Sequence, residues 1–254
     1  MQDDLEFAFE LAALAASVSL PRFLSEDFTV ETKPDGSPVT DVDVDVESVL
    51  RRRIAECRPD QMVIGEEAGH AGASRWRWYL DPIDGTKRFI AGDPKWMTLI
   101  ALAHDETIVV GVVDLPALGQ RWWATSGGGA FHDGERIAVS TRTSLDEAIV
   151  NDSWRKDLAR GNHDHPLWII ARRCARIRPH QGHSMLAVAC GQADAALQVG
   201  SSSWDYAPLK VIVQEAGGSL TDFDGRDQID TGRVVATNGH LHQAVLELLR
   251  ERPT

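Results

Sequence analysis

The 254-residue chain has few cysteines and no excess of positive charge. Its cysteines, Cys57, Cys174 and Cys190, lie far apart and form no CxxC pair, so we expect reduced thiols and no disulfide framework. Acidic residues outnumber basic ones by 38 to 26, which gives a formal net charge of −12. A protein that binds the nucleic-acid backbone needs a basic surface, so the charge argues against a nucleic-acid partner.

The sequence also lacks an uninterrupted apolar stretch of about 18 residues, which argues against a membrane-spanning segment. Small apolar residues do occupy positions 11–20, but Asp3, Asp4, Glu6 and Glu10 come before them. A secretory signal carries positive charge in that place. We therefore expect an amphipathic first helix, a cytoplasmic protein and no membrane partner.

What is present is an alternation of helical and strand-like patterns, which predicts an α/β (α+β) fold. Apolar spacing predicts helices over residues 3–25 and 42–57, with a loop at residues 32–38 between them. Short apolar runs predict strands in the middle of the chain, at residues 62–64, 78–80, 98–103, 108–113, 121–125 and 137–140.

The pattern changes again after about residue 145, where strands and helices alternate. We expect strands at residues 148–151 and 193–198, and helices at residues 183–191, 204–216 and 240–250. The sequence therefore predicts two parts, residues 1–145 and residues 146–254.

The densest concentration of chemically useful residues is Asp81-Pro82-Ile83-Asp84-Gly85-Thr86, which follows the apolar run Trp78-Tyr79-Leu80. We expect that strand to end at Asp81-Pro82 and to deliver two carboxylates onto a turn. Carboxylates held in this way suit a hard divalent cation such as Mg²⁺. The backbone N–H groups after Asp84 would suit a phosphate if a helix begins there. The simplest alternative is an ordinary surface turn.

Two further acidic positions follow the same logic. Glu66 and Glu67 come directly after the predicted strand at residues 62–64, where they are either metal ligands or solvated loop acids. Asp205 lies at the start of a predicted helix, where it is an N-cap or a ligand. These two roles are compatible, because one carboxylate oxygen can serve each.

Together these three motifs resemble the inositol monophosphatase family. Gly65-Glu66-Glu67, the motif at residues 81–86 and Trp204-Asp205 stand in the order found in that family, and residues 37–43 and 236–239 resemble its flanking motifs. The resemblance covers about residues 3–250. It implies a layered α-β-α-β-α sandwich and a Mg²⁺-dependent, lithium-sensitive phosphatase that acts on a small phosphorylated metabolite, commonly as a homodimer.

The resemblance also implies roles for individual residues. Asp43 and Thr86 would orient and deprotonate the attacking water, with Glu66 as a further catalytic residue. Two or three Mg²⁺ ions would be held by Glu66, Asp81, the carbonyl oxygen of Ile83, Asp84 and Asp205. The substrate would be contacted by Gly85, Thr86, Gln181, His183, Gln198 and Asp205.

The choice of phosphate ester rests on two opposing sets of residues. Residues 81–89 with Lys87, and residues 116–123, resemble the histidinol-phosphate phosphatase branch of the family. However, Gln181 and Gln198 stand where acids are usual, and the loss of two negative charges disfavours a cationic substrate. We expect histidinol phosphate, with myo-inositol 1-phosphate or another sugar or nucleotide (bis)phosphate as the alternative. A catalytically inactive binding homologue is the alternative from a different class.

Three other features have simpler interpretations. His163 and His165 lie in a loop rich in polar residues, and the basic cluster at residues 172–178 is typical of a solvated edge. Gly127-Gly128-Gly129 lacks the Lys-Ser/Thr ending of a phosphate-binding loop, so we interpret it as a turn.

Overall fold

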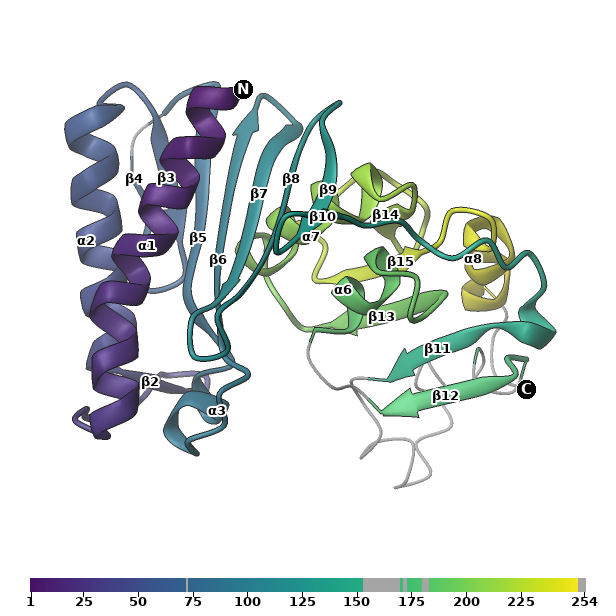
Figure 1. Cartoon of the computed structure of the whole chain (residues 1–254), viewed down its shortest axis with the longest axis horizontal. Coiled ribbons are helices and arrows are strands. Elements are labelled where there is room, and N and C mark those ends of the chain that lie inside the picture. Colours follow the sequence, from purple (N-terminus) through teal and green to yellow (C-terminus); the bar gives the residue numbers. More distant parts are fainter. Residues whose placement is uncertain (72, 153–169, 171–172, 180–182, 251–254) are drawn as a thin grey trace. The chain divides into compact units, whose positions relative to one another are not determined.

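The computed structural model describes residues 1–71, 73–152, 170, 173–179 and 183–250. The chain forms two compact units (Figure 1). The first unit comprises Met1–Ser126 and Phe131–Gly134, and the second comprises Gly127–Ala130 and Glu135–Thr254. The division near residue 145 stays a prediction. Helices and mixed sheets occur in both units, which confirms the predicted α/β class.

The first unit is built on a sheet covered by two long helices, α1 (Gln2–Ser25) and α2 (Asp41–Cys57), which lie side by side on one face (Figure 1). Both helices were predicted. Six strands of the sheet follow the order β8-β7-β6-β5-β3-β4. Their bounds are Met62–Gly65 (β3), Gly69–Ala71 (β4), Trp76–Asp84 (β5), Met97–His104 (β6), Thr107–Leu115 (β7) and Gln120–Thr125 (β8).

Among the described residues, α1 is the one helix that is long and apolar enough to span a membrane, with a mean hydropathy of 1.4 in its most apolar window. Core helices of soluble proteins and signal sequences near an N-terminus meet the same test. Phe7, Leu11 and Ala15 of α1 are buried in the core of the first unit together with Leu50 and Ile54 of α2. Packing against the core of the first unit therefore accounts for the buried apolar residues of α1, and 33% of its most apolar window is buried.

One local prediction in the first unit was confirmed and one was wrong. Residues 33–37 form the predicted loop, which joins β1 (Val30–Thr32) to β2 (Pro38–Thr40) in a hairpin that the sequence did not predict. Strand β5 does not end at Asp81-Pro82 but continues to Asp84. Its pairing with β6 shifts register between Asp81 and Asp84, and a proline is tolerated at such a bulge because the ladder is already interrupted there.

The chain passes from the first unit to the second through β9 (Gly129–His132) and β10 (Glu135–Arg136). The strand predicted at residues 137–140 is not formed. In its place the backbone N–H of Val139 donates to the carbonyl of Ala216, and the side chain of Val139 lies against Gly217 and Gly218. This extended segment is therefore fixed at the end of a helix rather than in a sheet ladder.

The second unit contains a five-stranded sheet of order β12-β11-β13-β15-β14. Its strands are Ile149–Asp152 (β11), Arg176–Pro179 (β12), Ala195–Val199 (β13), Ser219–Asp222 (β14) and Arg233–Thr237 (β15). After the short 3-10 turn Leu145–Glu147, its described helices are Ser184–Ala189 (α6), Ser203–Glu215 (α7) and His242–Arg250 (α8). The core of this unit gathers apolar side chains from the sheet and from α8, among them Val150, Leu197, Val235 and Val245.

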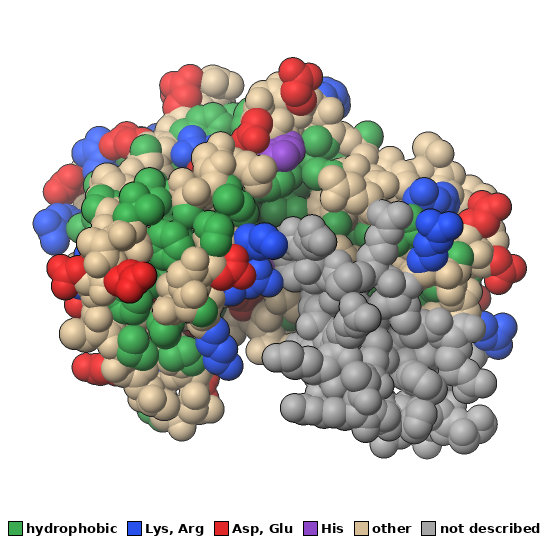
Figure 2. Space-filling model, turned by 60° about the horizontal axis from the view of Figure 1, so that its bottom comes forward, with side chains coloured by type: hydrophobic (Ala, Val, Ile, Leu, Met, Phe, Trp, Pro, Cys, Tyr) green, Lys and Arg blue, Asp and Glu red, His purple; other side chains and the backbone are tan. Residues whose placement is uncertain are grey.

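The surface mixes charges of both signs. On the described part of the face shown in Figure 2, acidic and basic side chains are interspersed with apolar ones. Several charges elsewhere on the surface are paired, as in the ion pairs of Arg53 with Glu10 and of Arg75 with Asp105.

Candidate active site

Asp43 lies in the first turn of α2, where the sequence Thr40-Asp41-Val42-Asp43 forms a capping box. The backbone N–H of Thr40 donates to Asp43 Oδ2 at 2.8 Å, and the hydroxyl of Thr40 donates to the same oxygen. Burial of Asp43 raises the pKa of its carboxyl above the usual value, although the hydrogen bonds from Thr40 and Thr86 act in the opposite direction.

Thr86 contacts the same carboxylate from another element. It is the first residue of α3 (Thr86–Ile90), which begins after Gly85 in a left-handed conformation with φ of 86°. Thr86 Oγ1 lies 3.1 Å from Asp43 Oδ1 and 3.2 Å from the carbonyl oxygen of Ile83. The hydroxyl has one proton, so it can donate to either oxygen while its lone pairs accept a further hydrogen bond.

The short helix α3 is fixed by an aromatic cluster. Phe89 is buried against Phe23, Phe28 and Trp96, with ring centroids 5.0 to 5.3 Å apart. A five-residue helix has little stability of its own, so this packing holds Thr86 in place.

Asp81 and Asp84 flank the bulge of β5. Asp81 is buried and Asp84 is partly exposed, and one carboxylate oxygen of each lies within 4.8 Å of the other. The carbonyl of Pro82, inside the bulge, accepts a hydrogen bond from the buried hydroxyl of Thr98 at 2.9 Å. Two carboxylates and the carbonyl of Ile83 are the hard oxygen donors that Mg²⁺ prefers, so these residues fit such an ion.

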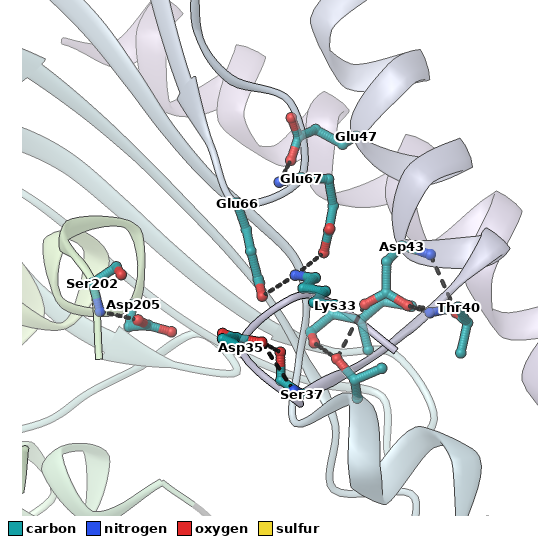
Figure 3. Close-up of polar contacts among 12 residues, drawn as sticks. Lys33, Asp35, Ser37, Thr40, Asp43, Glu47, Glu66, Glu67, Ser202 and Asp205 are labelled. Atoms are coloured by element: carbon teal, nitrogen blue, oxygen red, sulfur yellow. Dashed lines mark hydrogen bonds and ion pairs between the residues drawn. The ribbon is translucent and has the colours of Figure 1, made fainter. Parts of the chain in front are cut away.

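Glu66 and Glu67 follow β3 and share one cation. Lys33, from the hairpin β1–β2, places its ammonium nitrogen 2.8 Å from Glu66 Oε1 and 2.9 Å from Glu67 Oε1 (Figure 3). Two acids and one ammonium leave a net negative charge, which suits an additional cation at Glu66.

The same group of charges shifts two pKa values. Burial raises the pKa of Glu67 to about 7, with a further increase from the neighbouring Glu66 and a decrease from Lys33. Burial lowers the pKa of Lys33, but its hydrogen bonds to Glu66 and Glu67 outweigh this and raise the pKa above its usual value. Burial of Glu67 outweighs the opposing effect of the Lys33 ammonium, so Glu67 binds a proton more readily than an isolated glutamate.

Asp205 belongs to the second unit, where it occupies the first turn of α7. The N-cap is Ser202, and its backbone N–H donates to Asp205 Oδ2 at 2.5 Å (Figure 3). Asp205 is thus the capping-box partner and not the N-cap itself.

The proposed substrate contacts all fall in the second unit, apart from Gly85 and Thr86. His183 is the N-cap of α6, and its Nδ1 accepts a hydrogen bond from the backbone N–H of Met185 at 3.3 Å. Gln198 on β13 donates from Nε2 to Ser201 Oγ at 2.8 Å, and its Oε1 is buried with no hydrogen-bond partner among the described residues. Gln181, the His163–His165 loop and Arg172 lie outside the described residues.

Two residues beside the candidate metal ligands were not expected from the sequence: Lys33, which contacts Glu66, and Thr98, which contacts the carbonyl of Pro82 between Asp81 and Asp84. Lys33 was interpreted only as part of a turn, and its signal, a lysine at the tip of a hairpin, is weak without the pairing of β1 and β2. Thr98 is a polar residue within the apolar run of β6, which is a usable signal that a buried carbonyl needs a donor.

The triglycine segment is a turn, as predicted, and it contacts a carboxylate of its own unit. The N–H groups of Gly127 and Gly129 donate to Oε1 and Oε2 of Glu215, at 2.7 and 2.8 Å. Glu215 is the last residue of α7. Both glycines have positive φ, which turns their N–H groups toward one acceptor.

The model of the inositol monophosphatase family matches residues 1–254. A histidinol-phosphatase of Mycobacterium tuberculosis is 42% identical, with 97% of this chain and 98% of the relative covered. An inositol-1-monophosphatase of Mesorhizobium japonicum is 32% identical, with 94% of each chain covered. The solved inositol monophosphatase of Zymomonas mobilis superimposes with a TM-score of 0.84 at 29% identity, over 98% of both chains.

Proposed function

The chain belongs to the inositol monophosphatase family and is a phosphoric monoester hydrolase, and we propose that it hydrolyses histidinol phosphate with the help of Mg²⁺. The observation that carries the choice of substrate is the higher identity to a histidinol-phosphatase than to an inositol-1-monophosphatase, over nearly the whole chain in both cases. One structural neighbour, an IMPase/NADP phosphatase, was solved in complex with Mg²⁺ and phosphate.

Five residues of this chain would hold the metal ions. The ligands that we assign are the carboxylates of Glu66, Asp81, Asp84 and Asp205 and the carbonyl oxygen of Ile83. The proximity of the Asp81 and Asp84 oxygens and the net negative charge around Glu66 support the assignment. Asp205 would contribute the oxygen that its capping-box bond does not use. When bound, Mg²⁺ supplies positive charge that neutralises the phosphate and makes a bound water more acidic.

The protein's part in the reaction is to orient and deprotonate water. Thr86 Oγ1 donates its proton to Asp43 Oδ1, so that the lone pairs of the threonine oxygen accept a proton from the attacking water. The hydrogen bonds from Thr40 hold the Asp43 carboxylate in one orientation. Glu66 would act beside this pair. Phosphoryl transfer requires positioning and charge stabilisation more than covalent chemistry, so carboxylates and a threonine suffice.

Substrate binding would use backbone and side-chain donors. The N–H groups of Gly85 and Thr86 would bind the phosphate, while Gln181, His183, Gln198 and Asp205 would contact the rest of the substrate. The buried Oε1 of Gln198 can accept a hydrogen bond from an ammonium or a hydroxyl group.

A neutral polyol phosphate, such as myo-inositol 1-phosphate, is the second candidate substrate. It is favoured by the neutral amide of Gln198, because a carboxylate would bind the cationic amine of histidinol more strongly than an amide does. Hydrolysis of a sugar or nucleotide (bis)phosphate and a catalytically inactive homologue are the remaining alternatives.

The experiment is phosphate release in Mg²⁺ from histidinol phosphate, myo-inositol 1-phosphate, fructose 1,6-bisphosphate and adenosine 3′,5′-bisphosphate. We expect kcat/KM for histidinol phosphate to exceed the others at least about tenfold, which corresponds to about 1.4 kcal/mol. Faster hydrolysis of the inositol ester would assign the enzyme to the second candidate. We also expect a cytoplasmic homodimer, and sedimentation equilibrium measures the oligomeric state directly.

A further inference from the structure

Glu47 is a buried carboxylate that has no part in the reaction described above. It lies on α2 and is 1% exposed. Its Oε2 accepts a hydrogen bond from the backbone N–H of Glu67 at 2.7 Å, and its Oε1 accepts one from the N–H of Ala68 at 2.9 Å (Figure 3 shows Glu47 above Glu67). Both oxygens thus bind the backbone of the turn that follows β3. This turn, residues 65–68, also carries Glu66.

The turn approaches Glu47 as closely as a glycine allows. A Cβ added to Gly65 would lie 2.5 Å from both Cδ and Oε1 of Glu47, which is shorter than any ordinary carbon contact. Gly65 does not have a positive φ, so its backbone conformation alone does not require glycine. The space that the Glu47 carboxylate occupies is therefore the reason for glycine at this position.

The charge of Glu47 is compensated on its own helix. Arg51, one turn further along α2, donates from Nε to Glu47 Oε1 at 2.7 Å, and its guanidinium also donates to the carbonyl of Gly69. Arg51 thus binds both the carboxylate and the far end of the turn. A buried carboxylate is tolerated when it is paired and hydrogen-bonded in this way.

Glu47 stands four residues after Asp43, so the two buried carboxylates lie one turn apart on the same helix. Asp43 binds Thr86, and Glu47 binds the turn that carries Glu66. Helix α2 thus connects the group that would activate water to one that would hold a metal ion.

We propose that Glu47 is a positioning residue for the metal site: by holding the backbone at Glu67 and Ala68, it fixes the direction in which the Glu66 carboxylate points. The inference rests on the proposed function, because it takes Glu66 as a metal ligand. Groups that orient a metal ligand typically change metal affinity by about 10- to 100-fold when they are replaced.

The test measures Mn²⁺ binding to the full-length protein in the absence of substrate. Binding is detected by electron paramagnetic resonance, as a decrease in the signal of free Mn²⁺. Mn²⁺ suits the same oxygen ligands as Mg²⁺. In Glu47→Gln, the amide NH₂ group would face a backbone N–H, so one of the two bonds to the turn is lost. We expect the dissociation constant for Mn²⁺ to rise at least about tenfold. Glu56→Gln is the matched control, since Glu56 is 57% exposed on the same helix, and it should bind like the wild type.

A second variant, Gly65→Ala, keeps every charge and displaces the Glu47 carboxylate by steric contact, so it tests the inference if Glu47→Gln does not fold. Circular dichroism and thermal unfolding establish how much of each variant is folded. A purely structural role would lower the melting temperature and leave the Mn²⁺ affinity of the folded protein unchanged.

The outcomes separate the inference from the proposed function. If the wild type binds Mn²⁺ and hydrolyses a phosphate ester, but a folded variant binds Mn²⁺ within twofold of the wild type, the positioning role is refuted and the proposed function stands. If the wild type binds no Mn²⁺, the metal assignment and the inference are both refuted. Weaker binding in Glu47→Gln or Gly65→Ala with normal binding in Glu56→Gln supports the positioning role.

Discussion

Thr86 Oγ1 lies 3.1 Å from Asp43 Oδ1, although 43 positions separate the two residues in the chain. Thr86 begins α3, and Asp43 lies in the first turn of α2. Both are held locally, Asp43 by the capping box with Thr40 and Thr86 by the aromatic packing of α3. The contact is therefore preorganised before any substrate binds.

Replacement of Thr86 by alanine should lower kcat far more than it raises KM. The variant keeps the fold and loses the hydroxyl that would relay the proton of the attacking water, and the loss of such a group typically costs about 10²- to 10⁴-fold. Steady-state kinetics in saturating Mg²⁺ measures both constants. Thr86→Ser retains the hydroxyl and should keep most of the activity. A variant with normal kcat and raised KM would assign Thr86 to substrate binding instead.

Asp84→Asn should abolish turnover without unfolding the protein. The amide has the same shape as the carboxylate but lacks the charge that a divalent cation requires, and Asp84 is partly exposed, so the fold does not depend on its burial. Phosphate release and thermal unfolding measured on the same sample separate the two effects. Near-normal activity would contradict the assignment of Asp84 to the metal site.

Thr98→Val should destabilise the first unit and weaken catalysis together. The hydroxyl of Thr98 donates a hydrogen bond to the carbonyl of Pro82 in the bulge between Asp81 and Asp84. Valine cannot donate this bond, so the carbonyl loses its donor. We expect a loss of about 1 to 3 kcal/mol in the free energy of unfolding, measured by urea denaturation. Thr98→Ser is the control because it keeps the donor. Equal stability of the valine variant and the wild type would show that water replaces the bond.

The stability of the second unit should fall as the pH drops below about 6.5, because of His242. Its ring nitrogens lie 3.0 Å from the hydroxyls of Thr221 and Thr237, and burial lowers its pKa from the ordinary 6.5. The unfolded chain therefore takes up a proton that the folded protein resists. The stability that the neutral His242 ring contributes is fully present above pH 6.5. It is lost as the pH falls from 6.5 through the lower pKa of the folded protein.

Urea denaturation at pH 7.5 and 5.5 tests this expectation in the wild type and in His242→Gln. The variant should lose less stability on acidification than the wild type. Glu67 acts in the opposite sense, since its folded pKa of about 7 lies above the ordinary 4.5, so its protonation favours the folded state as the pH falls. Comparison with the variant removes this opposing contribution, and identical pH profiles would contradict the role of His242.

The sequence predicted the regular elements well where an apolar pattern was long. Helices α1 and α2 and strands β6 and β7 agree with the expected ranges within a few residues, since 17 to 24 helical residues with a buried face leave a strong periodic signal. Short elements were missed. Strands β1 and β2 have three residues each, and none of the residues in β1 is buried, so they leave no apolar pattern.

The candidate site was predictable only in part. The residue types and order of the acids at Glu66, Asp81 and Asp84 identified the family, but local patterns said nothing of which atoms would meet. The bulge in β5 depends on a hydrogen bond from a neighbouring strand, and the Lys33 ion pair depends on a hairpin 33 positions away from Glu66. Such contacts are set by tertiary packing, which overrides the preference of Asp-Pro for a turn.

The two bonds from Gly127 and Gly129 to Glu215 also have a consequence for ligands that the protein meets in solution. The triglycine turn offers the kind of converging N–H groups that capture free anions, but a carboxylate tethered to the same fold already occupies them. A tethered competitor acts at high effective concentration, so inorganic phosphate released by the enzyme has little chance of displacing it. The bound phosphate that leaves the active site therefore finds these N–H groups already hydrogen-bonded to Glu215.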